Sequence, residues 1–204
     1  MRQYYTSHLR ELNVLGTFLE TIIGIFNVNT AEKEPFNLDK WDFEEYMIEG
    51  FDISSENSIP LLCAHLYYRL LKSVPSLVRL WFSECKSRQF VLAVENYTEK
   101  FFSPLLVSFE IKSVQKLIDN DMSIKVNPKT YDIAASYTFE EAELDIIIKM
   151  PSCFPLKLAE VSSGSGGGRM AGISDARWRG WLLAVSSVMM GHNGSVADSL
   201  AQFK

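Results

Sequence analysis

The sequence predicts an α+β fold, in which a helical first half is followed by an antiparallel sheet and two closing helices. Up to about residue 102, apolar residues recur every three or four positions, which is typical of helices with one buried face. Beyond Pro104, apolar and polar residues alternate, and the links between the alternating stretches have about four residues. Such links are too short for the helical crossovers of a parallel sheet. We therefore expect an antiparallel four-stranded meander with flanking helices.

Length and composition agree with one folded domain or two small ones. The chain has 204 residues, 47% of them hydrophobic, and a formal net charge of −5. This apolar content excludes a disordered segment. No apolar run reaches the roughly 18–20 residues of a membrane span, and residues 1–30 lack the pattern of a signal peptide. We expect a soluble, cytoplasmic chain with no membrane partner.

Four helices are expected in the first half, and Pro and polar residues mark their limits. Pro60 lies in the first turn of the second helix, and Pro104 is expected to end the fourth. The predicted ranges are 5–26, 58–71, 76–85 and, after the polar Lys86-Ser87 pair, 88–102. The expected buried faces include Leu15, Leu19, Ile22 and Phe26 in the first helix, and Leu62, Leu66 and Leu70 in the second.

The alternating part contains the strand candidates. Leu144, Ile146 and Ile148 share one face, as do Ile133, Ala135 and Tyr137. The candidates are residues 109–117, which alternate only loosely, then 123–126, 131–138 and 142–150.

A Ser/Gly-rich stretch at residues 162–168 is expected to be a flexible link. Two helices follow this link. Ser174 and Asp175 open the first, Gly191 ends it, and Ser195 caps the last helix.

No catalytic constellation is evident. Cys63, Cys85 and Cys153 are too widely spaced for a disulfide framework or a zinc-ligand pair, so we expect reduced packing residues. The Gly-rich residues 163–169 lack the Gly-Lys-Ser/Thr ending of a phosphate-binding loop. The carboxylates at 140–143 are interpreted as turn residues rather than acid/base partners. We expect neither a metal site nor a cofactor within this chain.

Charge is unevenly distributed along the sequence. Residues 32–56 hold nine acidic residues and two lysines, a local net charge of −7. We interpret this stretch as a solvated acidic loop, with an acidic docking site as the alternative. Residues 61–130 hold ten basic and six acidic residues, a local net of +4. This polarity favours a partner surface that is oriented electrostatically.

Several short motifs follow one another in a specific order and spacing. They are Ala-His-Leu-Tyr-Tyr-Arg at 64–69, Pro-Ser-Leu-Val-Arg at 75–79 with Trp-Phe at 81–82, Thr-Glu-Lys-Phe-Phe-Ser-Pro at 98–104, Ala-Ser-Tyr at 135–137, Pro151 with Phe-Pro-Leu at 154–156, Trp-Arg-Gly-Trp-Leu at 178–182, and His-Asn-Gly-Ser at 192–195 followed by Leu200. In this order they resemble the C-terminal region of the listerin family, which are RING-type ubiquitin ligases of ribosome-associated quality control.

The resemblance implies the end of a HEAT-like helical-repeat region with the acidic loop in residues 1–75. It implies an RWD domain, a relative of the ubiquitin-conjugating-enzyme fold, in residues 76–204. Phe154 replaces the Tyr of the usual RWD loop and removes its hydroxyl. The His-Pro-Asn motif and nucleophilic Cys of a conjugating enzyme are absent from residues 162–181, so no thioester is expected. Zinc is expected only in a RING, for which this chain has too few ligands.

The resemblance implies that this chain is a non-catalytic docking and positioning region of an E3 ubiquitin ligase. The implied partners are the large ribosomal subunit, a stalled nascent chain, other quality-control subunits and, through the RING, a ubiquitin-conjugating enzyme. No small-molecule substrate is expected. The candidate ribosome contacts are Lys112, Lys116, Lys125, Lys129, Arg169 and Arg177.

The alternative function is a protein–protein interaction module that binds a conjugating enzyme or a partner subunit instead. Its surface would expose an apolar patch and bind without dependence on salt. Trp178 and Trp181 are candidate partner anchors or core residues, and core packing is favoured for at least one of them.

Overall fold

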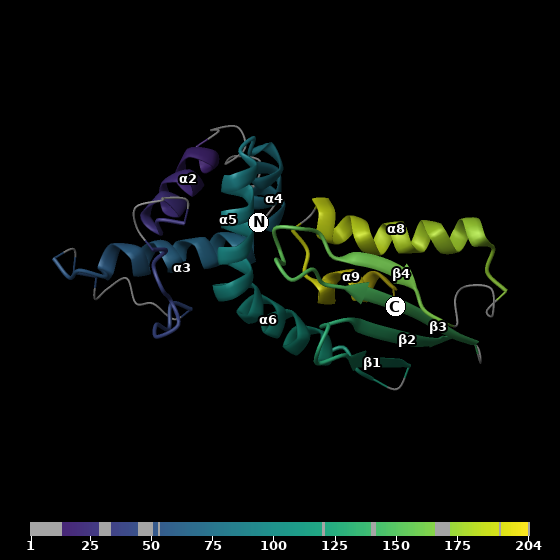
Figure 1. The fold of residues 1–204 in the computed structure, drawn as a ribbon. Helices are drawn as coiled ribbons and strands as arrows, with labels where there is room; N and C mark the ends of the chain where they lie inside the picture. Colours follow the sequence, from purple (N-terminus) through teal and green to yellow (C-terminus); the bar gives the residue numbers. More distant parts are fainter. Residues whose placement is uncertain are drawn as a thin grey trace. The chain divides into compact units, whose positions relative to one another are not determined.

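The computed structural model describes residues 14–28, 34–44, 51–52, 54–119, 121–139, 142–165, 172–191 and 193–203. The chain forms two compact units, Met1–Pro104 and Leu105–Lys204 (Figure 1). The first unit is helical in its described part, and the second combines helices with a sheet. The predicted α+β class is confirmed.

The predicted division between residues 75 and 76 lies inside the first unit. The Ser-Val-Pro sequence at 73–75 separates two helices of that unit rather than two domains. The ring of Tyr97, beyond this break, lies 5.1 Å from the ring of Phe26, before it. The same core therefore includes residues on both sides of Val74-Pro75. The chain only changes direction at this proline. The helices of the first unit are α2 (Leu15–Ile25), α3 (Ser58–Ser73), α4 (Pro75–Glu84) and α5 (Arg88–Phe101).

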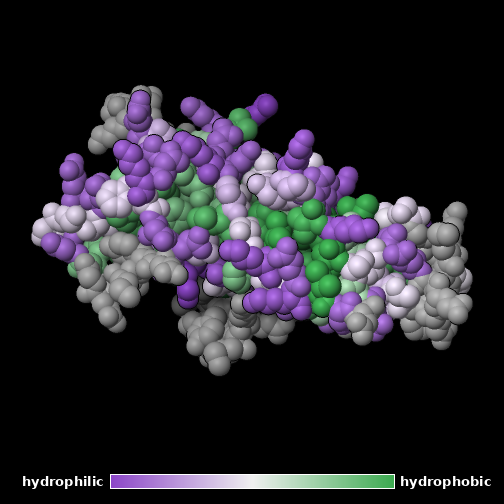
Figure 2. All heavy atoms as spheres, turned by 90° about the horizontal axis from the view of Figure 1, so that it is seen from below, coloured by the Kyte–Doolittle hydropathy of each residue, from purple (hydrophilic) through white to green (hydrophobic). Residues whose placement is uncertain are grey.

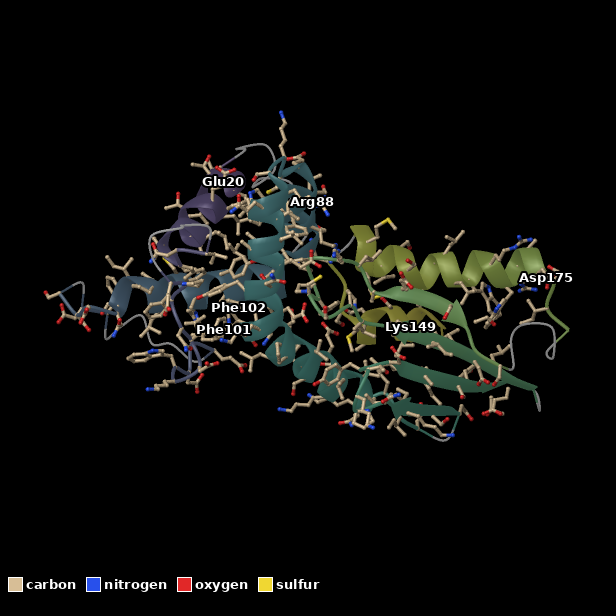
Figure 3. All side chains as sticks on the ribbon, in the orientation of Figure 1. Glu20, Arg88, Phe101, Phe102, Lys149 and Asp175 are labelled. Carbon is tan, nitrogen blue, oxygen red and sulfur yellow. The ribbon has the colours of Figure 1, made fainter. Side chains whose placement is uncertain are left out.

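An aromatic cluster forms the centre of the first unit. The ring centroid of Phe102, which follows α5 (Figure 3), lies 4.9 Å from those of Phe43 and Tyr67. Phe26 and Tyr97 complete the cluster, and Phe26, Tyr67 and Phe102 are fully buried. Each buried aromatic ring contributes roughly 1.5–3 kcal/mol of transfer free energy. The predicted buried face of α2 is confirmed, because Leu15, Leu19, Ile22 and Phe26 are all buried.

The predicted buried face of α3 was wrong. Leu62, Leu66 and Leu70 are only half-buried. The face that meets the core consists of Leu61, Cys63, Ala64, Tyr67, Tyr68 and Leu71. Both rows of residues have helical spacing, so periodicity alone could not separate them. Tertiary contacts decide between the two rows. The ring of Tyr67 packs in the aromatic cluster, and the Tyr67 hydroxyl is hydrogen-bonded to Thr98 Oγ1 at 3.0 Å.

Residues 109–117 do not form the expected strand. Most of them belong to α6 (Ser103–Gln115), and Pro104 lies in the first turn of this helix. A proline is favourable there because its missing N–H would have no partner within the helix. Leu106, Val107 and Val114 are buried at spacings that fit a helix. Pro104 therefore begins a new helix, and α5 already ends at Phe101.

The sheet of the second unit is a four-stranded antiparallel meander with strand order β1-β2-β3-β4. Its inner face is fully buried at Ile133, Ala135, Ile146 and Ile148, which alternate with outward residues as predicted. Tyr137, predicted on the same face, is only half-buried. The strands are β1 (Met122–Val126), β2 (Ile133–Phe139), β3 (Ala142–Lys149) and β4 (Glu160–Ser163).

The fourth strand lies partly in the stretch that was expected to be flexible. Ser162 pairs with Ile147 and Ser163 with Ile146 in the sheet. Gly164 continues this pairing, because its N–H donates to Asp145 O at 2.8 Å and a Cβ there would lie 2.5 Å from Asp145 Cβ. The absence of a side chain allows this close approach. Residues 166–168 lie outside the described residues.

Two helices complete the second unit, as predicted. They are α8 (Asp175–Gly191) and α9 (Val196–Phe203). Asp175 begins α8 (Figure 3), which packs against β4 and α9. Trp178, Val185 and Met189 form the buried face of α8.

Candidate docking surfaces

Four of the candidate lysines are exposed along consecutive elements of the second unit. Lys112 lies in the last turn of α6, and Lys116 follows one turn later. Lys125 points outward from β1, between the half-buried Ile124 and Val126. Lys129 lies in the β1–β2 turn, where its N–H donates to Asn127 Oδ1 at 2.9 Å. The structure therefore offers two pairs of ammonium groups, one at the end of α6 and one on β1 and its turn.

Carboxylates in the same stretch are engaged with backbone groups. Asp119 Oδ1 accepts the N–H groups of Asp121 at 3.1 Å and Met122 at 3.0 Å. Glu110 Oε2 accepts the N–H of Val196 at 2.9 Å. These hydrogen bonds fix the orientation of both carboxylates, and the two negative charges reduce the local positive potential.

The remaining two candidates do not join these lysines in the described structure. Arg177 is exposed on α8, with its guanidinium carbon 5.5 Å from the centre of the Trp181 ring. Because α8 packs against β4 and β1 is at the other edge of the sheet, Arg177 is separated from Lys125 by the width of the sheet. Arg169 lies outside the described residues.

The two candidate tryptophans differ in environment. Trp178 is 7% exposed, and its indole N–H donates to Ser163 Oγ at 3.2 Å, which connects α8 to β4. Trp181 is half-buried, and its ring lies 6.2 Å from that of Trp178. Trp178 is thus placed as a core residue, whereas Trp181 keeps surface that a partner can reach.

Apolar side chains are exposed on the second unit as well. Leu183 is 70% exposed and Met190 59% exposed. They are about two turns apart on α8 and so share one face, with the exposed Ser187 between them. Phe109 and Ile118 are also exposed, near the lysines of α6. On the face shown in Figure 2, green hydrophobic surface lies beside purple hydrophilic side chains.

The cysteines have the environment of packing residues. Cys63 and Cys153 are buried and Cys85 is half-buried, and all three are free thiols. Burial raises the pKa of the Cys63 thiol above its ordinary value. Burial also raises the pKa of Cys85, and Glu20 and Glu84 add to this effect. A raised pKa disfavours the thiolate, which is the nucleophilic form.

The described residues contain no cluster of three or more His, Cys, Asp or Glu side chains that could hold a metal ion. His65 Nδ1 is 2.8 Å from Phe43 O and serves the packing of the first unit. No helix in the described part of the chain is long and apolar enough to cross a membrane.

The first unit contains a cavity of about 620 Å³ between α5 and the segment that precedes residue 38. Tyr97 and Lys100 lie on its wall, and Lys100 Nζ is 3.8 Å from Asp39 Oδ2. Both partners of this ion pair are more than half exposed, so the pair stabilises the wall little. The lining residues are Val28, Glu34, Pro35, Asn37, Ala93, Asn96, Tyr97, Lys100 and Phe101.

Comparison with known proteins decides the family. Residues 1–115, more than half of the chain, match the family model described as the LTN1 family HEAT repeat region. The chain belongs to the listerin (LTN1) family. Residues 122–204 match a second model, described as ubiquitin conjugating domain-like, which agrees with the sheet and closing helices of the second unit. The resemblance to listerin and the expected helical-repeat and conjugating-enzyme-like parts are confirmed.

Individual listerins align over nearly the whole chain. The E3 ubiquitin-protein ligase listerin of Schizosaccharomyces pombe is 32% identical over 97% of this chain, and that of Mus musculus 30% identical over all of it. The Saccharomyces cerevisiae listerin is 28% identical, again over the full chain. The chain spans only 12–13% of the length of these listerins.

Proposed function

We propose that this chain is the docking and positioning region of a listerin-type E3 ubiquitin ligase that modifies stalled nascent chains on the large ribosomal subunit, in the cytoplasm. Catalysis belongs to a zinc-binding RING elsewhere in the protein, which recruits the ubiquitin-conjugating enzyme. Other quality-control subunits are further partners. The names of the listerin relatives support the ligase activity.

The lack of an accessible cysteine in the conjugating-enzyme-like part is the main support for a non-catalytic role. Between residues 122 and 204 the sequence contains one cysteine, Cys153, and it is 1% exposed. A conjugating enzyme needs an accessible thiolate to carry ubiquitin as a thioester. The stretch from β4 to α8, where such an enzyme would carry its nucleophile, has no cysteine. The fold therefore serves binding and geometry.

The exposed lysines support docking on the ribosome. A surface of ammonium groups is attracted to the phosphates of ribosomal RNA and to acidic protein surfaces. Docking would hold the RING beside the exit of the nascent chain. This replaces a bimolecular encounter by a local one with a high effective concentration.

The test replaces Lys112, Lys116, Lys125 and Lys129 together by alanine in the full-length protein and measures its affinity for purified large subunits across salt concentrations. If each lysine meets one phosphate of duplex RNA, the slope of log affinity against log salt falls by about 3.6 in magnitude. A matched control replaces four cations of the first unit, Lys40, Lys86, Arg88 and Lys100, which are exposed as well. An unchanged affinity and slope in the second-unit variant would contradict docking through these lysines.

The exposed face of α8 favours a second candidate, a protein–protein interaction module. Leu183 and Met190, with Ser187 between them, form an exposed and uncharged face that suits a partner helix or a conjugating enzyme. Glutamate at both positions would abolish such binding, and the binding of the unmodified protein would change little with salt. If this double variant loses binding to a purified conjugating enzyme or partner subunit, and the four-lysine variant keeps its affinity for the large subunit, the second candidate is correct.

A further inference from the structure

Residues 193 and 194, between α8 and α9, have backbone positions that constrain the side chains they can carry. Asn193 adopts a left-handed backbone with φ of 52° and is 3% exposed. The N–H of Gly194 donates to Val188 O at 3.1 Å. A Cβ at residue 194 would collide with the side chain of Val188 and lie 3.0 Å from its carbonyl oxygen. The Asn-Gly pair therefore brings the chain back tightly against the end of α8.

The first turn of α9 is held from two directions. Ser195 Oγ accepts the N–H of Asp198 at 3.0 Å, and Asp198 Oδ2 accepts the N–H of Ser195 at 2.9 Å. This reciprocal pair is a capping box built within the helix itself. Glu110 of α6 provides the second connection, because its Oε2 accepts the N–H of Val196 at 2.9 Å across 86 positions of sequence. A carboxylate is favourable there because the N-terminus of a helix carries partial positive charge.

One side of α9 is buried in the unit. Val196 is 1% exposed, and Ser199 and Leu200 are fully buried. The hydroxyl of Ser199 donates to Ser195 O at 3.1 Å, so this buried polar group is satisfied. An eight-residue helix is marginal in water without such support. The direction of α9 is therefore set by its connections to α6 and α8.

We propose that Glu110 is a positioning residue that sets the direction in which the chain leaves α9, and with it the reach of the RING. This inference rests on the proposed function, and it adds the premise that the RING is attached beyond α9. Glu110 and the Asn-Gly-Ser turn at 193–195 together make a fixed joint rather than a hinge. A fixed joint confines the RING to a narrow set of positions, so only nascent-chain lysines at certain distances from the ribosome are modified efficiently.

The experiment uses full-length protein with large subunits that carry stalled nascent chains, each with a single lysine at a different distance from the exit. Glu110→Ala is compared with Glu110→Gln, which keeps a carbonyl acceptor for the Val196 N–H. Glu160→Ala, a loss of an exposed glutamate on β4, is the matched control. Three quantities are measured for each variant. They are hydrogen exchange of the α9 amides, affinity for the large subunit, and the initial rate of ubiquitination at each lysine position.

We expect Glu110→Ala to speed exchange of the α9 amides about three- to ten-fold while β2 and β3 keep their protection. The rate at the preferred lysine falls by a similar factor and rates at disfavoured positions rise, with subunit affinity unchanged. Glu110→Gln restores most of the wild-type pattern, and Glu160→Ala does not depart from it.

Wild-type α9 exchange and an unchanged lysine pattern in Glu110→Ala would overturn the inference. So would a uniform fall at all lysines or a parallel loss of subunit affinity, because either would show a general structural role. Failure of the proposed function looks different. In that case the unmodified protein itself would neither bind the subunit nor modify any of the nascent chains.

Discussion

Replacing the two tryptophans of α8 one at a time separates core packing from surface contact on a single helix. Trp178→Ala removes a side chain that is 7% exposed and the indole N–H that Ser163 Oγ accepts. Substitutions of this kind cost about 3–5 kcal/mol, because both the transfer free energy and the cavity count. Trp181 is half-buried and Leu183 is 70% exposed. We expect Trp181→Ala to cost about 1–2 kcal/mol and Leu183→Ala less than about 0.5 kcal/mol.

The assays are urea and thermal unfolding of the chain, together with hydrogen exchange in the β2–β3 pair so that the second unit is observed separately. For a unit of this size, each kcal/mol shifts the melting temperature by about 4–8 °C. Trp178→Ala should therefore lower the melting temperature of the second unit by about 12–40 °C. Trp178→Phe, which keeps an aromatic ring but loses the N–H, should lie between Trp178→Ala and the unmodified chain.

Equal losses for Trp178→Ala and Trp181→Ala would refute this reasoning. A loss of less than about 1 kcal/mol in the free energy of unfolding of Trp178→Ala would also refute it, since truncating so buried a side chain should cost more. The same variants inform function. A fall in partner binding for Trp181→Ala, with stability largely kept, would identify Trp181 as the anchor.

Further predictions concern the aromatic cluster, a buried hydroxyl, the α8–α9 turn and the thiols. Phe102→Ala should destabilise the first unit by about 3–5 kcal/mol in urea unfolding, because four aromatic rings surround Phe102. Burial, aided by Tyr67, raises the pKa of Tyr97, whose hydroxyl donates to Phe36 O at 2.7 Å. The folded state therefore keeps this proton when the unfolded chain loses it. The contribution of Tyr97 to stability is thus fully present below about pH 10 and is lost above it. Tyr97→Phe should flatten that fall when unfolding is measured from pH 8 to 11. Gly194→Ala should cost about 1–3 kcal/mol through its collision with Val188, whereas Gly180→Ala, in open space on α8, should not destabilise thermal unfolding. In the native chain, a thiol reagent should modify Cys85 before the buried Cys63 and Cys153, and equal rates would contradict their burial.

The strands with strict alternation and the helices with terminal signals were the most predictable elements. Leu144, Ile146 and Ile148 are buried together as expected. Ser195 caps α9 as predicted, because a side chain that accepts an N–H three residues on is a local event. Residues 109–117 failed because loose alternation and a helical pattern overlap there. β4 was missed because Ser162 and Ser163 are neither β-branched nor aromatic, and their strand is defined by its pairing with β3.

The candidate site was predictable as a set of exposed charges but not as a geometry. The lysines at 112, 116, 125 and 129 are exposed on consecutive elements, whereas Arg177 is separated from them by the sheet. Sequence spacing could not show this separation, because the strand order decides which elements become neighbours. Trp178 and Trp181 have the same residue type and lie three positions apart, yet only Trp178 reaches the core.

By itself, the sequence indicated the listerin family, the α+β class, the positions of most helices and the absence of cysteine from residues 162–181. These depend on residue identity and local periodicity, which each segment carries alone. Only the tertiary structure decided which face of α3 is buried, that Pro104 begins a helix, and that Glu110 holds Val196. The physical reason is that packing and hydrogen bonds between distant segments select among local patterns of similar free energy. The joint at α9 is such a case, because its two partners are 86 positions apart and neither shows in its own segment what it will contact.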